Sequence, residues 1–270
     1  MNTYNLRIAG VRIRILASRQ IIPPEKFRPF IADNSGDADV TVEIFFGNTS
    51  VEDCGGSKIF RVTQNQNGDD IVRIESEYGR SYKLLIPERL SDSVCKSGNW
   101  LLYLPLKKVM LPFGRMIIHA SAVIYRGEAY VFSAPSGSGK STQADIWNRE
   151  FGAEIINGDK VILSLENGRV IAHGGPAAGS SGIYKNICAP VAAIMLIGKS
   201  EENRIEMLSP SAAYLGLYSE ALKSVDDPDF NRALLPETEK VVKNVPVARL
   251  LCRPDRSAAE CVLNMLRAQE

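Results

Sequence analysis

The chain has 270 residues, of which 45% are hydrophobic and 23% are charged. This composition is too apolar for a disordered chain, and the length is sufficient for one large or two modest globular domains. The 32 Lys and Arg residues against 31 Asp and Glu residues leave a net charge of +1, which does not favour a protein that binds nucleic acid or a membrane surface.

No apolar run has the length of a transmembrane span, and the longest, Ala192–Ile197, has the length of a strand. The first residues lack the charged and apolar regions of a secretion signal, so we expect a cytoplasmic protein. The five cysteines show neither CxxC spacing nor pairing with histidine: Cys54, Cys95, Cys188, Cys252 and Cys261. This pattern predicts small buried side chains rather than a zinc site or a disulfide framework.

The N-terminal part of the chain is rich in predicted strands. Tyr4–Leu16 alternates apolar and polar residues, which predicts a half-buried strand. Further strands are predicted at Val40–Phe46, Lys58–Thr63, Ile71–Ser76, Tyr82–Ile86 and Trp100–Leu104, with a hairpin turn at Asn67-Gly68. Because residues 1–110 hold no catalytic constellation, we expect a β-rich accessory or substrate-docking domain there and a second domain over 111–270.

The second domain has the pattern of an α/β fold. Two apolar runs, Met116–Tyr125 and Ala129–Ala134, are joined by a short hairpin-like connection, and a helix is predicted from Lys140 to about Glu150. The elements predicted further along are strands at Glu154–Ile156, Val161–Leu165, Arg169–Ala172, Ala192–Ile197, Arg204–Met207 and Val247–Leu251, and helices at Ser209–Lys223, Asp229–Lys243 and Ser257–Arg267, capped by Ser209 and Ser257.

A glycine-rich loop between a predicted strand and a predicted helix is the most specific motif. Ala134–Ser141 reads APSGSGKS, which matches G-x-x-x-x-G-K-[ST] except at its first glycine. Gly137 and Gly139 allow backbone N–H groups to turn towards phosphate oxygens. Lys140 can then reach the β- and γ-phosphates, and the Ser141 hydroxyl can ligate Mg²⁺. The motif therefore predicts a phosphate-binding loop.

Phosphoryl transfer also needs an acidic residue that binds the metal or accepts the proton of the attacking oxygen. The sequence position of this acid is less regular than that of the glycine-rich loop. The apolar strand Ala193–Ile197 is followed by Gly198-Lys199, so it lacks the terminal Asp of the usual second motif. The acid close downstream of the loop is Asp159, eighteen residues after Ser141. It either lies at a strand end beside the phosphate loop or belongs to an Asn-Gly-Asp turn between two hairpin strands.

Three segments together resemble the catalytic domain of HPr kinase/phosphorylase: His119-Ala-Ser, Val131–Thr142 and Ile156–Val161. They are still more similar to the HPr-kinase-like proteins of peptide-modification clusters, and more distantly to phosphoenolpyruvate carboxykinase. The resemblance extends over about 114–186, and the N-terminal half does not resemble the regulatory domain of HPr kinases.

The resemblance implies an α/β P-loop kinase domain that uses ATP and Mg²⁺ to phosphorylate a serine hydroxyl. The nucleotide would be bound by Ser136, Gly137, Ser138, Gly139, Lys140, Ser141 and Thr142. His119 would lie near the reacting phosphate, and Ser141 and Asp159 would hold the metal. Asp159 matches the second of two adjacent acids in the family, but here the first of them is Gly158. Asp159 therefore acts as the base alone or holds Mg²⁺, and reversal by phosphorolysis is left open.

Three features have both a functional and a structural interpretation. His119 is either a site residue or a hairpin histidine bonded to backbone. The glycine-rich stretch His173–Asn186 is either a loop near the nucleotide or, as we favour, a surface loop. Arg253 and Arg256 either bind phosphate or an acidic substrate or, as is more common, are solvated charges at a helix start.

The leading hypothesis is a kinase acting on a serine of a peptide or small protein. The alternatives are a kinase of a free small molecule, such as serine itself, and a nucleotide-responsive binding module without turnover. The phosphate loop does not separate these functions, because it contacts only the nucleotide. The sequence leaves open whether the chain forms a homo-oligomer.

Overall fold

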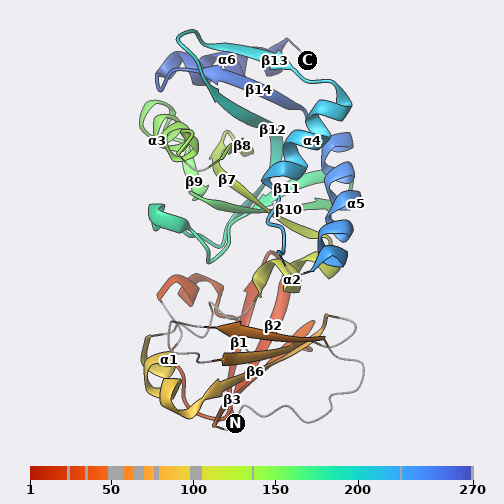
Figure 1. Cartoon of the computed structure of the whole chain (residues 1–270). Helices are drawn as coiled ribbons and strands as arrows, with labels where there is room; N and C mark the ends of the chain where they lie inside the picture. The colour runs from red at the N-terminus through yellow and green to blue at the C-terminus, as the bar shows by residue number, and fades with distance from the viewer. Residues whose placement is uncertain are drawn as a thin grey trace. The chain divides into compact units, whose positions relative to one another are not determined.

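The protein is described by a computed structural model. It covers residues 1–22, 25–33, 36–47, 58–63, 70–75, 79–97, 105–135, 137–225 and 227–268. The fold is mixed α/β and divides into two compact units, Met1–Pro112 and Phe113–Glu270 (Figure 1). The roles predicted for the two domains stay predictions.

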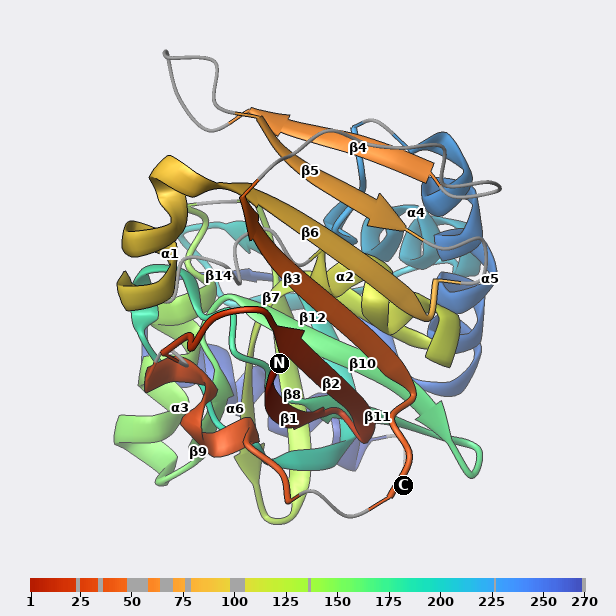
Figure 2. The ribbon, with the colours of Figure 1, turned by 90° about the horizontal axis from the view of Figure 1, so that it is seen from below.

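The first unit is built on a six-stranded sheet in the order β1-β2-β3-β6-β5-β4 (Figure 2). Its strands are β1 (Asn2–Ile8), β2 (Val11–Ala17), β3 (Val40–Gly47), β4 (Lys58–Thr63), β5 (Asp70–Glu75) and β6 (Ser81–Pro87). Its helical segments are η1 (Glu25–Phe30), η2 (Glu88–Leu90), α1 (Ser91–Ser97) and α2 (Leu106–Met110), with η4 (Leu111–Phe113) at the division between the units. The strands predicted from β3 to β6 are confirmed, whereas Asn67-Gly68 and Trp100–Leu104 lie outside the described residues.

The single strand predicted over Tyr4–Leu16 is wrong, because this segment is a hairpin of β1 and β2. Ala9 and Gly10 form its turn. Their φ angles are 47° and 81°, and a two-residue type I′ hairpin turn requires a positive φ at both residues. Leu6 lies opposite Ile13 in the antiparallel pair, so both face the core. The side chains that face the core have even numbers up to Ile8 and odd numbers from Val11 onward. One continuous strand cannot place both sets on the same face, because alternate residues point to opposite faces.

The second unit is built on an eight-stranded sheet whose main path runs β11-β10-β7-β8-β12-β14-β13, with β9 paired to β7. Its strands are β7 (Arg115–Tyr125), β8 (Glu128–Ser133), β9 (Glu154–Asn157), β10 (Lys160–Glu166), β11 (Arg169–His173), β12 (Cys188–Lys199), β13 (Arg204–Met207) and β14 (Val247–Cys252). Its helices are α3 (Lys140–Phe151), α4 (Pro210–Glu220), α5 (Pro228–Asn244) and α6 (Arg256–Arg267), with η5 (Gly179–Ser181). The strands β8, β12 and β14 are parallel neighbours, and the β7–β8 hairpin is confirmed.

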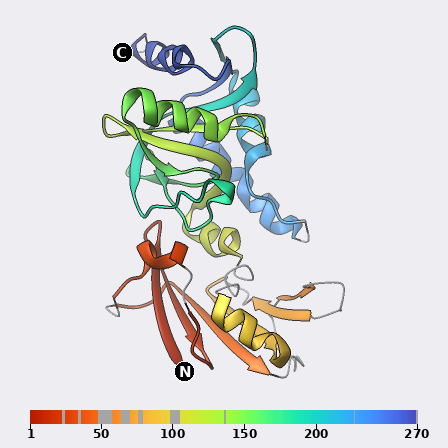
Figure 3. The same ribbon diagram turned by 90° about the vertical axis from the view of Figure 1, so that its left-hand side faces the viewer.

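Helix α3 is fixed on the sheet by an aromatic core. Trp147 is fully buried, and its ring centroid lies 4.4 Å from that of Tyr130 and 5.7 Å from that of Phe132. Helix α6 packs on the same face through Ala258 and Val262. Figure 3 shows α3, drawn in green, lying along the outside of this sheet, and Figure 1 shows α4 and α5 on the sheet's other side. This packing holds the first turn of α3 at the carboxyl end of β8.

Two helix starts test the predicted caps. Ser209 accepts a hydrogen bond from Ala212 N at the start of α4, as predicted. For α6 the predicted cap Ser257 is wrong: the helix begins at Arg256, so Asp255 is the N-cap and its carboxylate accepts from Ala258 N.

No helix in the described part of the chain is both long enough and apolar enough to span a membrane.

Candidate functional site

The glycine-rich loop connects β8 to α3 over 134–139. Gly137 and Gly139 have φ of 78° and 103°, in the left-handed region that glycine adopts without a steric penalty. Gly139 is the N-cap of α3 and, being a glycine, has no side chain that could accept from the first amides of the helix. Ser136, predicted to bind nucleotide, lies outside the described residues.

The two reactive side chains of the motif have different partners. Lys140 is buried, and its Nζ donates to the carbonyl oxygens of Ala134 at 2.7 Å and Pro135 at 3.4 Å. The ammonium group is therefore held inside the loop. Ser141 Oγ donates to the carbonyl oxygen of Gly158 at 3.2 Å, which joins the start of α3 to the β9–β10 segment.

Asp159 lies at a break in a line of backbone pairing along β7. The strands β9 and β10 both pair antiparallel with β7, so 158–159 interrupts one line rather than turning between two hairpin strands. Asn157 Oδ1 accepts from the amides of Asp159 at 2.9 Å and Lys160 at 2.8 Å, which fixes the break. Ala120 N donates to Asp159 O at 3.0 Å. The hairpin-turn interpretation is wrong, and Asp159 lies beside the loop.

The stretch that follows β11 packs against this break. The Asn157 amide donates to the carbonyl oxygens of Gly175 at 3.0 Å and Ala177 at 3.1 Å. Gly174, Gly175 and Pro176 are buried, so the surface-loop interpretation is wrong for this part of the stretch. Its next turn contacts the acid itself, since a Cβ placed on Gly179 would lie 2.6 Å from Asp159 Oδ2. The Asp159 carboxylate therefore lies between this turn and Lys160 Nζ, which is 3.5 Å away.

Gly158 has no space for a side chain. A Cβ built on it would overlap the Cβ and Oγ atoms of Ser181. Ser181 is held there, because its hydroxyl donates to Ala178 O at 2.6 Å and accepts from Ile183 N at 3.3 Å. This contact leaves no room for an acidic side chain at position 158 in the structure.

We expect Gly158→Ala to lower the free energy of unfolding by about 1–3 kcal/mol, because an atom is forced into an occupied volume. Ser181→Gly removes the overlapping atoms together with two hydrogen bonds, so urea unfolding should compare the cost of Gly158→Ala in the parent and in the Ser181→Gly variant, where we expect it to be smaller. An equal cost in the two backgrounds would show that the two residues do not interact.

His119 lies on β7 directly opposite Lys160 on β10. Its carbonyl oxygen accepts from Ser133 Oγ at 2.7 Å, at the end of β8 where the glycine-rich loop begins. Loss of hydration within the site is the main factor that lowers the pKa of His119, with Lys160, Lys140 and Lys223 acting in the same direction and Asp159 opposing them. The imidazole is therefore neutral over most of the physiological range. The His119 side chain is exposed, and the bond from Ser133 places its backbone at the start of the glycine-rich loop.

Glu220 is an acidic residue close to Lys140 that the sequence analysis missed. A backbone bridge joins Ala221 to Ile118, and Leu222 N donates to Ile117 O at 2.9 Å, so the end of α4 is fixed against β7 next to His119. Burial raises the pKa of Glu220, although Lys140 and Lys223 both act to lower it. No local motif marks this glutamate, because only the tertiary fold brings it near Lys140.

We expect Glu220→Gln to stabilise the fold at neutral pH and to have little effect in acid. Since the folded state raises the Glu220 pKa, the protonated form favours folding below the ordinary glutamate value, and this contribution is lost as the pH rises through the raised pKa. Glutamine keeps the neutral form at every pH. Thermal unfolding from pH 4 to pH 8 measures the effect, with exposed Glu202→Gln as the control. A midpoint difference that does not grow with pH would contradict the expectation.

One cavity, of about 1020 Å³, is lined by the first turn of α3 with Lys140 and Ser141 and by Asp159, whereas His119 and Glu220 are not among its lining residues. Its wall includes Gly137–Gln143 and Asp159 on one side and the carboxyl ends of β12 and β14 on the other. In open sheets, ligands bind at the carboxyl ends of parallel strands. Arg253 is part of this wall. Arg256 instead makes a surface pair with Glu260 at 2.9 Å, as expected for a solvated charge.

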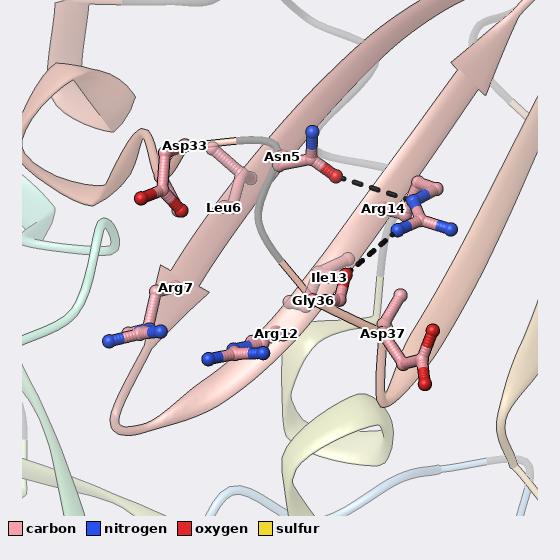
Figure 4. A pocket seen from close by; sticks show the side chains of 11 residues that line it. Asn5, Leu6, Arg7, Arg12, Ile13, Arg14, Asp33, Gly36 and Asp37 are labelled. Carbon is pink, nitrogen blue, oxygen red and sulfur yellow. Dashed lines mark hydrogen bonds between the residues drawn. The ribbon is translucent and has the colours of Figure 1, made fainter.

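The first unit has a charged hollow of its own, lined by arginines of β1 and β2 (Figure 4). Arg14 donates to Asn5 Oδ1 at 3.5 Å and to Gly36 O at 3.1 Å, while Arg7 and Arg12 lie opposite one another on the two strands. Its volume is only about 10 Å³, which is the space of one water molecule. It does not compete with the larger cavity as a site for a substrate.

Within the described residues, no group of three or more His, Cys, Asp and Glu side chains is arranged to hold a metal ion. Mg²⁺ needs no such group, because it keeps several waters and takes one or two protein ligands together with substrate phosphates. The Ser141 hydroxyl and the Asp159 carboxylate are oxygen donors on the same cavity wall, and Gly158 connects them. The residues present therefore fit a magnesium–triphosphate complex.

No protein-family model matches the chain, and no curated protein matches it. Solved structures do match, among them the Hpr(Ser) kinase/phosphatase from Coxiella burnetii. That structure is 15% identical in sequence, has a TM-score of 0.33 and is matched over 57% of this chain and 89% of its own. A likeness of this extent carries no argument about activity.

Proposed function

We propose that the protein is an ATP-dependent phosphotransferase that moves the γ-phosphoryl group to a serine hydroxyl of a peptide or small protein. The observation that carries this proposal is the hydrogen bond that connects the start of α3 to the segment of the acid. Ser141 bonds to Gly158 O, and this places the loop, the hydroxyl and Asp159 in one wall of the cavity.

In this proposal the loop and the first turn of α3 bind the triphosphate. The amides from Gly137 to Thr142 and the positive end of the α3 dipole face the phosphate oxygens. Lys140, now bonded to two carbonyl oxygens of the loop, exchanges these for phosphate oxygens and neutralises the charge of the transferring group. Catalysis then consists of positioning together with charge stabilisation.

The serine hydroxyl that receives the phosphoryl group must lose its proton, and a group in the site has to accept that proton. Asp159 lies beside the loop and its carboxylate is held by Lys160 and the turn at Gly179. His119, which lies opposite Lys160 on the neighbouring strand, is a second group that could accept the proton. When bound between Ser141 and Asp159, Mg²⁺ would supply charge neutralisation of the phosphate oxygens. Phosphoryl transfer needs little activation of the nucleophile, so one acid suffices despite Gly158.

The direct test is incubation of the full chain with γ-labelled ATP, Mg²⁺ and a library of serine peptides, followed by detection of labelled peptide. Parallel incubations with free serine and with hydroxylated metabolites identify a small-molecule kinase. Binding of ATP without any loss of the γ-phosphate identifies the binding module, which the single acid also permits. If none of these mixtures binds nucleotide, the proposed function is wrong.

A further inference from the structure

The cavity continues beyond the part that phosphates would occupy. Asp159 and the Lys140 ammonium group mark the side of the γ-phosphate, since this lysine reaches the β- and γ-phosphates in such loops. Thr142 and Gln143 follow on α3 and also line the cavity, as does the wall formed by β12 and β14. The chain of a bound triphosphate therefore runs from Asp159 towards that wall, and its α-phosphate end faces it.

This wall is partly apolar and carries no excess of charge. Ile197, Cys252 and Pro254 contribute apolar atoms to it. The cations Lys199 and Arg253 are accompanied there by the carboxylates of Glu201 and Asp255, the latter 3.2 Å from Arg253 Nε. A wall of mixed charge does not attract a polyanion, and it favours a flat, neutral group with an apolar face.

Gln143 supplies the second observation. Its side chain is 2% exposed, and its Nε2 donates to Cys252 Sγ at 3.3 Å. Its Oε1 is buried, and no donor for it exists among the described residues. The thiol can serve only one of the two amide atoms, so the other stays unpaired in either orientation of the amide. Gln143 also lines the cavity, so a donor on a ligand bound there would complete this hydrogen bond once the side chain turns towards it.

Arg253 is oriented before any ligand binds. Its backbone N donates to Asn203 Oδ1 at 2.7 Å, and its guanidinium is paired with Asp255. Guanidinium planes stack on aromatic rings and on nucleobases, which are flat and polarisable. The side chain is exposed, so a base can approach its face without displacing the core.

We propose that this part of the cavity, formed by Gln143, Ile197 and Cys252–Pro254, is a subsite for the nucleoside of the bound triphosphate. The base lies against Ile197 and Pro254 with Arg253 over its face, and Gln143 pairs with a polar group of the nucleoside. The inference rests on the proposed function, because it takes the position of the phosphates from the loop.

The test compares ATP with tripolyphosphate, which has the same phosphates and no nucleoside, by calorimetry on the full chain with Mg²⁺. We expect ATP to bind at least about tenfold more tightly, the effect of one well-stacked base. We expect Arg253→Ala and Gln143→Leu each to remove most of this difference while the affinity for tripolyphosphate is unchanged. Arg249→Ala, on β14 four residues before Arg253 and paired with Glu206 at 3.6 Å, is the matched control and should bind both ligands as the parent does.

The outcomes separate the subsite from the phosphate loop. Equal affinities for the two ligands, with both bound, would overturn the nucleoside subsite and leave the proposed function intact. The same loss of both affinities in Arg253→Ala would assign this arginine to phosphate and would also overturn the subsite. Absence of binding by both ligands would overturn the proposed function and the inference with it. Thermal unfolding of each variant shows that a loss of binding does not come from loss of the fold.

Discussion

Replacement of Lys140 by alanine is expected to abolish measurable triphosphate binding and to lower the rate of phosphoryl transfer by at least about 10²–10³-fold, the cost of removing one donor aimed at developing charge. The reason is geometric. The ammonium group is already enclosed by the loop, 2.7 Å from Ala134 O, where it can exchange a carbonyl oxygen for a phosphate oxygen with little movement. Transfer from γ-labelled ATP and calorimetric titration measure the two effects.

Lys140 is buried, so a loss of activity has to be separated from a loss of structure. Lys140→Met keeps most of the apolar stem and removes the charge. It should bind no triphosphate while its unfolding midpoint stays close to that of the parent. Lys240→Ala removes an exposed lysine of α5 that pairs only with Glu237 in the described structure, and it should leave both readouts unchanged. Unaltered binding in Lys140→Met would contradict the role given to the loop.

Local patterns predicted the elements that carry the site. The loop was marked by a motif that combines turn glycines with a lysine and a serine, and its predicted place between a strand and a helix is confirmed by β8 and α3. The sequence around Asp159 is compatible with two interpretations, a strand end beside the loop and a turn between two hairpin strands. The pairing of β9 and β10 with the same strand, β7, decides between them, and residue spacing does not encode that pairing.

What the sequence did not reveal depends on contacts between distant segments. Ser181 lies 23 residues after Gly158, yet it occupies the volume that a side chain at 158 would need. Glu220 lies close to Lys140 because the end of α4 bonds to β7. The hairpin of β1 and β2 is a different case. The apolar residues change from even to odd positions between Ile8 and Val11, and this change is visible in the sequence.

Replacement of Asp159 by asparagine is expected to lower turnover by about 10³-fold, a loss at the upper end of that expected for one electrostatic contact in a site of this kind. Asparagine keeps the size of the side chain and loses its charge. Asp145→Asn, an exposed position on α3, is the matched control and should keep full activity. A turnover in Asp159→Asn within about threefold of the control would contradict the role of this acid.

The same variant distinguishes a metal ligand from a base. If Asp159 holds Mg²⁺, asparagine raises the Mg²⁺ concentration required for half-maximal turnover, whereas loss of a base lowers turnover equally at every Mg²⁺ concentration. A third readout reports the site without turnover. Asp159 raises the pKa of His119, so Asp159→Asn should lower that pKa further, which NMR titration detects because the chain has only two histidines. Asp159→Glu should also fail, since Asp159 Oδ2 already packs against Gly179, and a longer side chain would have to displace the turn that positions it.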